Sequence, residues 1–89
     1  MTEDWEHCFI CGVSGQLEEH HIMKGKANRK ISERYLLKVP LCPTCHRNGK
    51  QAVHKCRQTD LWLIKEGQKA FEEAYSHELW MELFLKNYL

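Results

Sequence analysis

The clearest periodic pattern lies in the last third of the chain, where side chains suited to one buried helical face recur every three or four residues. From residue 59 onwards that face consists of Leu61, Ile64, Gln68, Phe71 and Tyr75. This spacing predicts an amphipathic helix, with Thr59 or Asp60 capping its first turn. Glycine costs a helix interior about 1 kcal/mol relative to alanine. Gly67 therefore predicts a kink or a close contact at that point.

A second helix is predicted over residues 77–89. Ser76 can cap its first turn. Its apolar positions are Leu79, Trp80, Leu83 and Phe84. These side chains would pack on the first helix, so the two helices form a C-terminal helical hairpin that supplies most of the hydrophobic mass. We therefore predict that residues 59–89 are the scaffold of the protein.

Earlier in the chain the apolar runs are short and favour strands over long helices. Residues 16–22 and 37–42 predict two short strands, and Pro40 indicates that the second is an edge strand or ends there. Between them, Ser32 predicts the start of a helical turn, with Glu33 in its first turn. The whole pattern predicts one α+β domain over residues 1–89, with a loose start at 1–7, a core at 8–58 and helices at 59–89.

Cysteine spacing indicates how so small a domain is stabilised. A chain of 89 residues buries a modest core, which favours a disulfide or metal staple. The opening segment is acidic without the apolar stretch of a signal peptide, and no apolar run is long enough for a membrane span, so we expect a reducing, cytoplasmic compartment. Two Cys-x-x-Cys pairs then predict a structural zinc, with iron–sulfur ligation as the alternative. The four ligands would be Cys8, Cys11, Cys42 and Cys45, whereas Cys56 lies outside the pattern.

Charge is unevenly distributed along the chain, although the net charge is only +1. Residues 1–23 carry a charge of −5, residues 24–57 carry +9 and residues 58–89 carry −3. A basic segment between two acidic ones is typical of a phosphate-facing surface on one side of a small domain. A solvated basic loop is the alternative interpretation.

Histidines are the candidates for a second site. His20 and His21 are adjacent, and neighbouring side chains on a strand point to opposite faces, so the two should have different roles. One can coordinate an ion while the other points at a substrate. The zinc clamp should bring His46 and His54 near them as further imidazole ligands, which suit zinc and other divalent transition ions. A buried polar cluster, a zinc site and a catalytic centre are the interpretations to be distinguished.

The order of these groups resembles that of the HNH, or ββα-metal, endonucleases. The shared elements are Cys-x-x-Cys, then Glu-x-His-His, then Leu-Cys-x-x-Cys-His and a later Val-His. The resemblance spans residues 8–89 and is nearest to short phage-encoded nucleases of the recombination-enhancement kind. One element differs. HNH sequences usually place an asparagine shortly before the second cysteine pair, and none lies between Asn28 and Cys42 here.

The resemblance implies a zinc-clamped ββα-metal core and a role for each residue of the second site. His21 matches the general base that activates water for attack on phosphorus. Glu18 and Glu19 would accept imidazole N–H groups and so orient the rings. The bound ion would be Zn, Mg, Mn or Ni. The ligand positions for that ion are matched by His20, His46 and His54.

The implied function is metal-dependent hydrolysis of DNA phosphodiester bonds, in phage recombination or DNA processing within a bacterial host. The implied partners are DNA and a recombination protein, with no membrane, and nothing favours one oligomeric state. Phosphate contacts would come from Lys24, Lys26, Arg29, Lys30, Arg47 and Lys50. Two alternatives are a non-catalytic zinc-binding module for DNA or protein interaction, which does not need His21, and a purely structural protein with two zinc ions.

Overall fold

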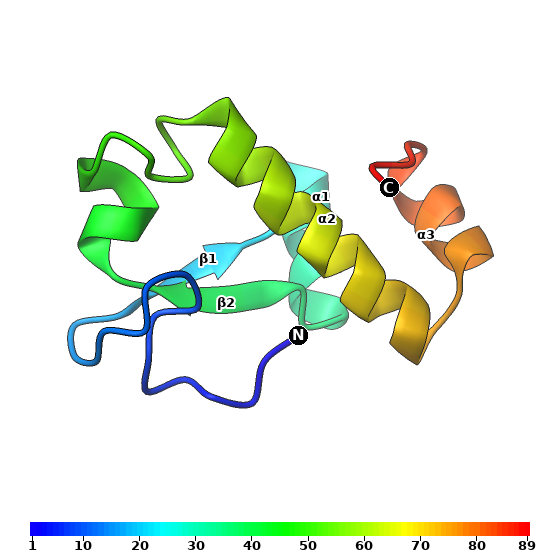
Figure 1. The fold of residues 1–89 in the computed structure, drawn as a ribbon. Coiled ribbons are helices and arrows are strands. Elements are labelled where there is room, and N and C mark those ends of the chain that lie inside the picture. Colours follow the sequence, from blue (N-terminus) through cyan, green and yellow to red (C-terminus); the bar gives the residue numbers. More distant parts are fainter.

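Two short strands and four helical segments make up the chain in the computed structural model, which describes all of residues 1–89; three of the helical segments follow the second strand (Figure 1). Their bounds are Glu18–His21 for β1, Lys26–Arg34 for α1, Lys38–Leu41 for β2, Thr44–Asn48 for η1, Arg57–Ala74 for α2 and His77–Phe84 for α3. The segment η1 is a single π-helical turn, whereas the others are α-helices. The protein is therefore a small α+β domain, as the sequence predicts.

The strands β1 and β2 form an antiparallel two-stranded sheet in which His20 lies opposite Val39 and His21 opposite Lys38. Both strands lie within the predicted ranges and are shorter at each end. Pro40 has no N–H to donate, which a two-stranded sheet tolerates because both strands are edges. The carbonyl of Pro40 accepts a 2.9 Å hydrogen bond from the N–H of Phe9. This bond ties the N-terminal loop to the sheet.

The helix α1 corrects the prediction for the connection between the strands. The predicted turn starting at Ser32 is wrong, because the helix already begins at Lys26, after Gly25 with a φ of 99°. Ser32 lies inside the helix and is buried, and its hydroxyl accepts a hydrogen bond from the N–H of Met23 at 3.3 Å. No capping side chain and no wide apolar stripe reveal this helix in the sequence. Its effect is to place Glu33 beside the sheet.

The helix α2 begins two residues before the predicted start. Cys56 occupies its N-cap position without a side-chain hydrogen bond, so the prediction of a cap at Thr59 or Asp60 is wrong. Asp60 is buried instead, and its carboxylate lies 3.0 Å from the Arg57 guanidinium and 3.5 Å from the Lys24 ammonium. A buried carboxylate needs such cations, because an unpaired charge is costly in the interior.

The buried face of α2 is also shifted from the predicted stripe. Leu61 is only half-buried and Tyr75 is 52% exposed. Gly67 lies on the buried face, where a Cβ atom would be 2.9 Å from Cγ2 of Ile22. This confirms the predicted close contact and turns the glycine side of the helix towards the end of β1. The buried residues of α2 are Asp60, Leu63, Ile64, Gly67, Gln68 and Phe71.

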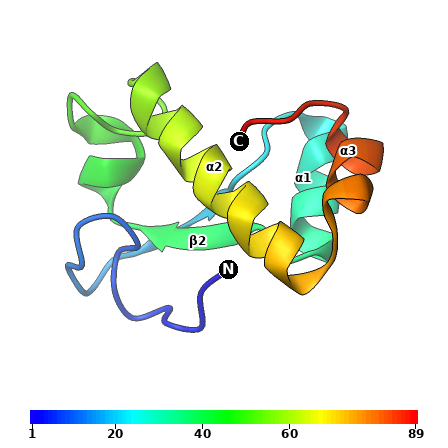
Figure 2. The same cartoon turned by 45° about the vertical axis from the view of Figure 1, so that its right-hand side comes forward.

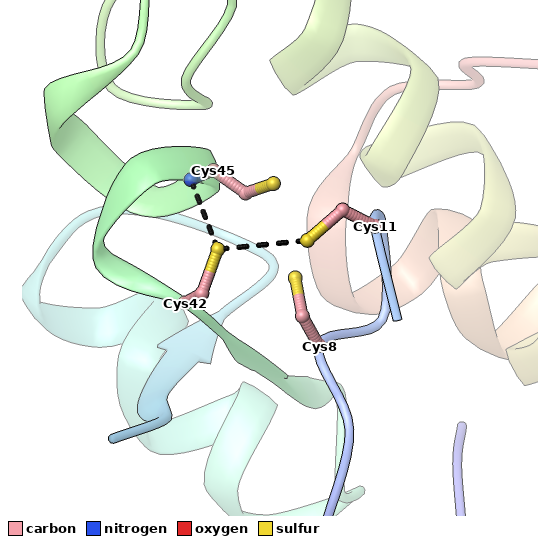
Figure 3. A group of neighbouring side chains, drawn as sticks. All are labelled: Cys8, Cys11, Cys42 and Cys45. Carbon is pink, nitrogen blue, oxygen red and sulfur yellow. Dashed lines mark hydrogen bonds between the residues drawn. The ribbon is translucent and has the colours of Figure 1, made fainter. Parts of the chain in front are cut away.

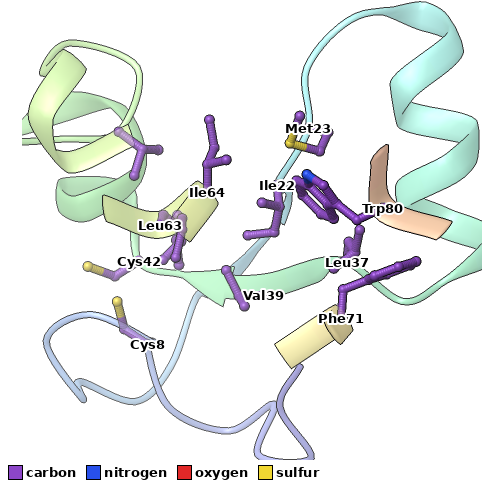
Figure 4. Packing of buried hydrophobic residues seen from close by; sticks show 12 residues of the cluster. Cys8, Ile22, Met23, Leu37, Val39, Cys42, Leu63, Ile64, Phe71 and Trp80 are labelled. Carbon is purple, nitrogen blue, oxygen red and sulfur yellow. The ribbon is translucent and has the colours of Figure 1, made fainter. Parts of the chain in front are cut away.

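The hydrophobic core lies between α2, α3 and the sheet (Figure 4). Ile22 and Val39 enter it from the strand region, Leu63 and Phe71 from α2, and Trp80 from α3. All five side chains are at most 2% exposed. This packing therefore holds β1 and β2 against α2. It also holds in place the polar residues of the two strands, which lie next to these core residues in the chain.

The helix α3 is capped as predicted, because the Ser76 hydroxyl accepts a hydrogen bond from the N–H of Leu79 at 3.0 Å. The helix ends at Phe84 rather than residue 89, since Leu85 adopts a left-handed conformation with a φ of 59°. The tail then turns back, and the carbonyl of Lys86 accepts a 2.8 Å hydrogen bond from the indole of Trp80. Figure 2 shows this return of the C-terminus towards α2. None of the helices is both long and apolar enough to cross a bilayer.

Candidate functional site

The four paired cysteines converge from two separate parts of the chain (Figure 3). Cys8 and Cys11 lie in the N-terminal loop, where the N–H of Gly12 donates to the carbonyl of Cys8 at 2.9 Å. Cys42 directly follows β2, and Cys45 lies in η1. The Sγ atoms of these four cysteines all lie within 4.8 Å of one another. This arrangement links the N-terminal loop to the turn after the sheet.

The spacing of the sulfur atoms suits a tetrahedral metal. The Sγ atoms of Cys11 and Cys42 are 3.7 Å apart, and the edge of a tetrahedron with Zn–S bonds of 2.3 Å is about 3.8 Å. A disulfide would need about 2.05 Å. The Cys42 sulfur also accepts a hydrogen bond from the N–H of Cys45 at 3.4 Å. The cysteine cluster is thus positioned to hold a metal ion, and its four thiols suit zinc.

The pKa values of the thiols in this cluster also favour a bound cation. Burial alone would raise the pKa of the Cys8 thiol, but hydrogen bonds from the N–H groups of Cys11, Cys42 and Ile10 outweigh burial and lower this pKa to about 6. The pKa of Cys45 is raised, first by burial and then by the neighbouring sulfurs of Cys42, Cys11 and Cys8. The Cys8 thiolate is therefore readily formed, whereas ionisation of Cys45 beside it needs a positive charge between the sulfurs.

Three histidines form a second cluster on the other side of η1. His20 comes from β1, His46 from η1 and His54 from the loop before α2. Their ligand nitrogens lie within 4.8 Å of one another, and Nε2 of His46 is 3.0 Å from Nε2 of His54. Two nitrogens bound to one zinc ion at tetrahedral angles would be about 3.3 Å apart. The structure thus brings together the three histidines predicted as ion ligands.

The most direct sign of a ligand at this cluster is the state of His20. Its ring is 3% exposed, and its Nε2 atom is buried with no hydrogen-bond partner. Leaving a buried polar atom unpaired costs about 1–3 kcal/mol, which a bound ion would offset. Burial, followed by the charges of His46 and His54, lowers the pKa of His20 to about 3. The ring therefore stays neutral at physiological pH, as a metal ligand must be.

Glu18 and Glu19 differ in their contacts. The Glu18 carboxylate lies 2.8 Å from Nδ1 of His46 and also pairs with Arg47. The His46 side chain and the Arg47 guanidinium lower the pKa of Glu18, so this carboxylate is charged and can accept the His46 N–H. Glu19 is exposed, and its carboxylate lies 3.5 Å from the His21 ring. Only Glu18 touches a member of the histidine cluster.

His21 lies beside the histidine cluster but outside it. Its Nε2 atom is 2.8 Å from a carboxylate oxygen of Glu33, and the other Glu33 oxygen is 2.7 Å from the ammonium of Lys38. The sequence pattern predicts Glu33 in the first turn of a helix and gives no sign of this contact. Twelve residues separate Glu33 from His21, and no short-range spacing signals their meeting. Only the path of α1 along the sheet brings them together.

An open depression of about 280 Å³ lies over the histidines. It is lined by Glu19, His20, His21, Met23, Lys24, Gly25, Arg29, His46 and His54. A second depression continues from it along α1, and the two share three residues. The second is lined by His21, Gly25, Lys26, Arg29, Lys30 and Glu33. His21 therefore stands where the histidine cluster meets the basic face of α1.

The six basic residues predicted to contact phosphates are not equivalent. Lys26, Arg29 and Lys30 are exposed, form no ion pair and line the second depression together. The remaining three differ: Lys24 pairs with Asp60, Arg47 pairs with Glu18, and Lys50 lines a separate depression beside Thr44 and Gly49. Lys26, Arg29 and Lys30 thus form a group of exposed cations on one face of α1.

Comparison of the chain with known protein families, with curated proteins and with solved structures finds no match. The function therefore has to be inferred from the chemistry of the two clusters and of the adjoining basic face.

Proposed function

We propose that this protein is a metal-dependent endonuclease that hydrolyses DNA phosphodiester bonds, with a ββα-metal site built from β1, β2 and η1. The observation that carries the proposal is the buried, unpartnered Nε2 of His20, which lies with His46 and His54 in an open depression next to His21. A merely structural histidine cluster would be expected to pair its buried nitrogen. This nitrogen instead supports a bound ion at a surface that a substrate can reach.

Each residue of the site has a chemical task in this proposal. An ion held by the three clustered imidazoles supplies Lewis acidity to the scissile phosphate. His21 accepts a proton from the attacking water, whose oxygen forms the new bond to phosphorus as the bond to the departing sugar oxygen breaks. Glu18 accepts the Nδ1–H of His46 and holds that ring in the orientation that presents Nε2 to the cluster.

The exposed face of α1 provides the binding surface for the DNA backbone. Lys26, Arg29 and Lys30 have no acidic partner, so their charge is available to phosphates. Contacts of this kind position the backbone but carry little sequence information. We therefore propose broad or structure-selective cleavage rather than a long recognition sequence. The resemblance to phage nucleases supports a recombination or processing intermediate as the substrate.

The test is DNA cleavage by the zinc-loaded protein with Mg, Mn, Zn or Ni added in turn. The variant His21→Ala should lose cleavage and keep DNA affinity. His77→Ala is a matched control, because His77 is also a histidine paired with a glutamate, Glu72, at 2.8 Å, but it lies far along the chain in α3. Equal cleavage by the wild type and His21→Ala, or no cleavage with any ion, would refute the proposal.

A second candidate function is a zinc-binding module that holds DNA or a recombination protein without cutting. The observation that favours it is that the cysteine cluster does not include His21 and that Lys26, Arg29 and Lys30 form no ion pair. Metal content separates the candidates. An endonuclease should take up a second ion that the double variant His20→Ala/His46→Ala loses, whereas a binding module should hold one zinc in both forms.

A further inference from the structure

Glu33 is out of place electrostatically in the basic depression along α1. It is the one acidic residue there, among Lys26, Arg29 and Lys30. Its pKa is lowered, first by the Lys38 ammonium and then by His21, so it carries a full negative charge. A carboxylate at this position repels phosphate and weakens the binding of any nucleic acid. A role in phosphate binding therefore does not account for it.

The contacts of Glu33 suggest another role. His21 and Lys38 lie directly opposite each other in the sheet, and Glu33 reaches both from α1. One oxygen of its carboxylate is 2.8 Å from His21 Nε2, and the other is 2.7 Å from Lys38 Nζ. Lys38 is held on its other side by Glu19 at 3.3 Å. Both oxygens of the Glu33 carboxylate are thus held by a partner. Its orientation towards the imidazole is set by contacts between α1, β1 and β2.

We propose that Glu33 is the positioning residue for His21. The charged carboxylate accepts the Nε2–H of the imidazole, which fixes the tautomer and leaves the Nδ1 lone pair free to accept a proton from water. Lys38 holds the Glu33 carboxylate in place. One oxygen of Glu19 lies 3.3 Å from Lys38 Nζ and 3.5 Å from His21 Nε2, so Glu19 supports this arrangement at longer distances than Glu33. This inference rests on the proposed endonuclease function, since it assigns a task to its general base.

The kinetic test compares Glu33→Ala and Glu33→Gln with Glu72→Gln as a matched control, since Glu72 also pairs with a histidine, His77, at 2.8 Å but lines neither depression. Single-turnover cleavage at saturating enzyme should fall roughly 10- to 100-fold in Glu33→Ala. Glu33→Gln keeps an acceptor oxygen and should lose less, and Glu72→Gln should stay near the wild type. DNA affinity should be equal or higher in both Glu33 variants, because a negative charge has been removed. A parallel loss of affinity and rate, or an equal loss in Glu72→Gln, would overturn the inference.

A second readout does not depend on cleavage. Long-range nitrogen–proton NMR of the ring at about pH 8, where a free histidine is neutral, reports the tautomer of His21. The wild type and Glu72→Gln should show the Nε2–H form, and Glu33→Ala should show a mixture. If no protein cuts DNA but the tautomer changes as expected, the endonuclease proposal fails while the positioning by Glu33 stands. An unchanged tautomer in Glu33→Ala, with the zinc content of the wild type, refutes the positioning role itself.

Discussion

Replacement of Gly67 by alanine tests the contact that seats α2 on the sheet. The added Cβ would lie 2.9 Å from Cγ2 of Ile22 and 3.7 Å from two further carbons of that side chain. Carbon atoms normally approach to about 3.5–4.0 Å. The Ile22 methyl group cannot swing away freely, because a β-branched side chain has few allowed rotamers and Ile22 is fully buried. The helix or the end of β1 must therefore shift.

Two opposing terms set the magnitude. Alanine favours a helix interior over glycine by about 1 kcal/mol. Overpacking a well-filled core costs about 1–3 kcal/mol. We expect the cost to exceed the gain, so that Gly67→Ala lowers the free energy of unfolding by about 1 kcal/mol. The propensity term can be measured separately in the same helix by comparing Lys65→Ala with Lys65→Gly, since Lys65 is exposed and forms no ion pair.

The assay is denaturant unfolding of the zinc-loaded protein, completed as a double-mutant cycle with Ile22→Ala. Ile22→Ala alone should cost about 2–5 kcal/mol, but it removes the methyl group that collides with the new Cβ. In that background Gly67→Ala should become stabilising by about 1 kcal/mol, so the effect changes sign. Stabilisation by Gly67→Ala in the wild-type background would show that the contact at Gly67 does not limit the packing of α2.

Three further predictions concern the metal, the basic face and α3. Cys42→Ser should abolish zinc binding and the cooperative thermal transition, followed by circular dichroism, because a structural zinc contributes about 10–16 kcal/mol; a chelator should do the same to the wild type. Replacing Lys26, Arg29 and Lys30 by alanine should reduce the slope of log affinity for DNA against log salt by about 0.9 for each phosphate that is no longer neutralised, measured by fluorescence anisotropy, with Lys50→Ala as the control that leaves the slope unchanged. Ser76→Ala should lower the free energy of unfolding by about 1 kcal/mol in urea titrations, because the N–H of Leu79 loses its capping partner, and Ser76→Asp should restore it.

The features that the sequence predicts well are those encoded over short distances. Each cysteine pair is recognisable from its own two-residue spacing, the strands show in short apolar runs, and the cap at Ser76 depends on a residue only three positions away. The close contact at Gly67 could be anticipated because glycine inside a helix is costly without a reason. Each of these signals is local, and each is present in the structure.

The features missed depend on contacts between distant segments. The helix α1 has few apolar side chains and no capping residue, so nothing in its sequence distinguishes it from a basic loop. Without this helix the contact of Glu33 with His21 is also hidden, since the helix carries Glu33 to the sheet. The buried face of α2 was misplaced because its centre is a glycine and one of its members is Asp60, neither of which adds to an apolar stripe.

The turn η1 couples the cysteine cluster to the histidine cluster. Cys45 belongs to the cysteine cluster and His46 to the histidine cluster, so a single peptide bond joins them. In the proposed form with two ions, an ion that orders this turn at the cysteines would also hold His46 in position, so the second ion would meet a smaller entropic cost. Thermodynamic linkage requires the reverse effect to be equal, so an ion at the histidines tightens the hold of the cysteines on theirs by the same factor. Titrations with metal should therefore be cooperative, and scarcity of the first ion should empty the second site as well.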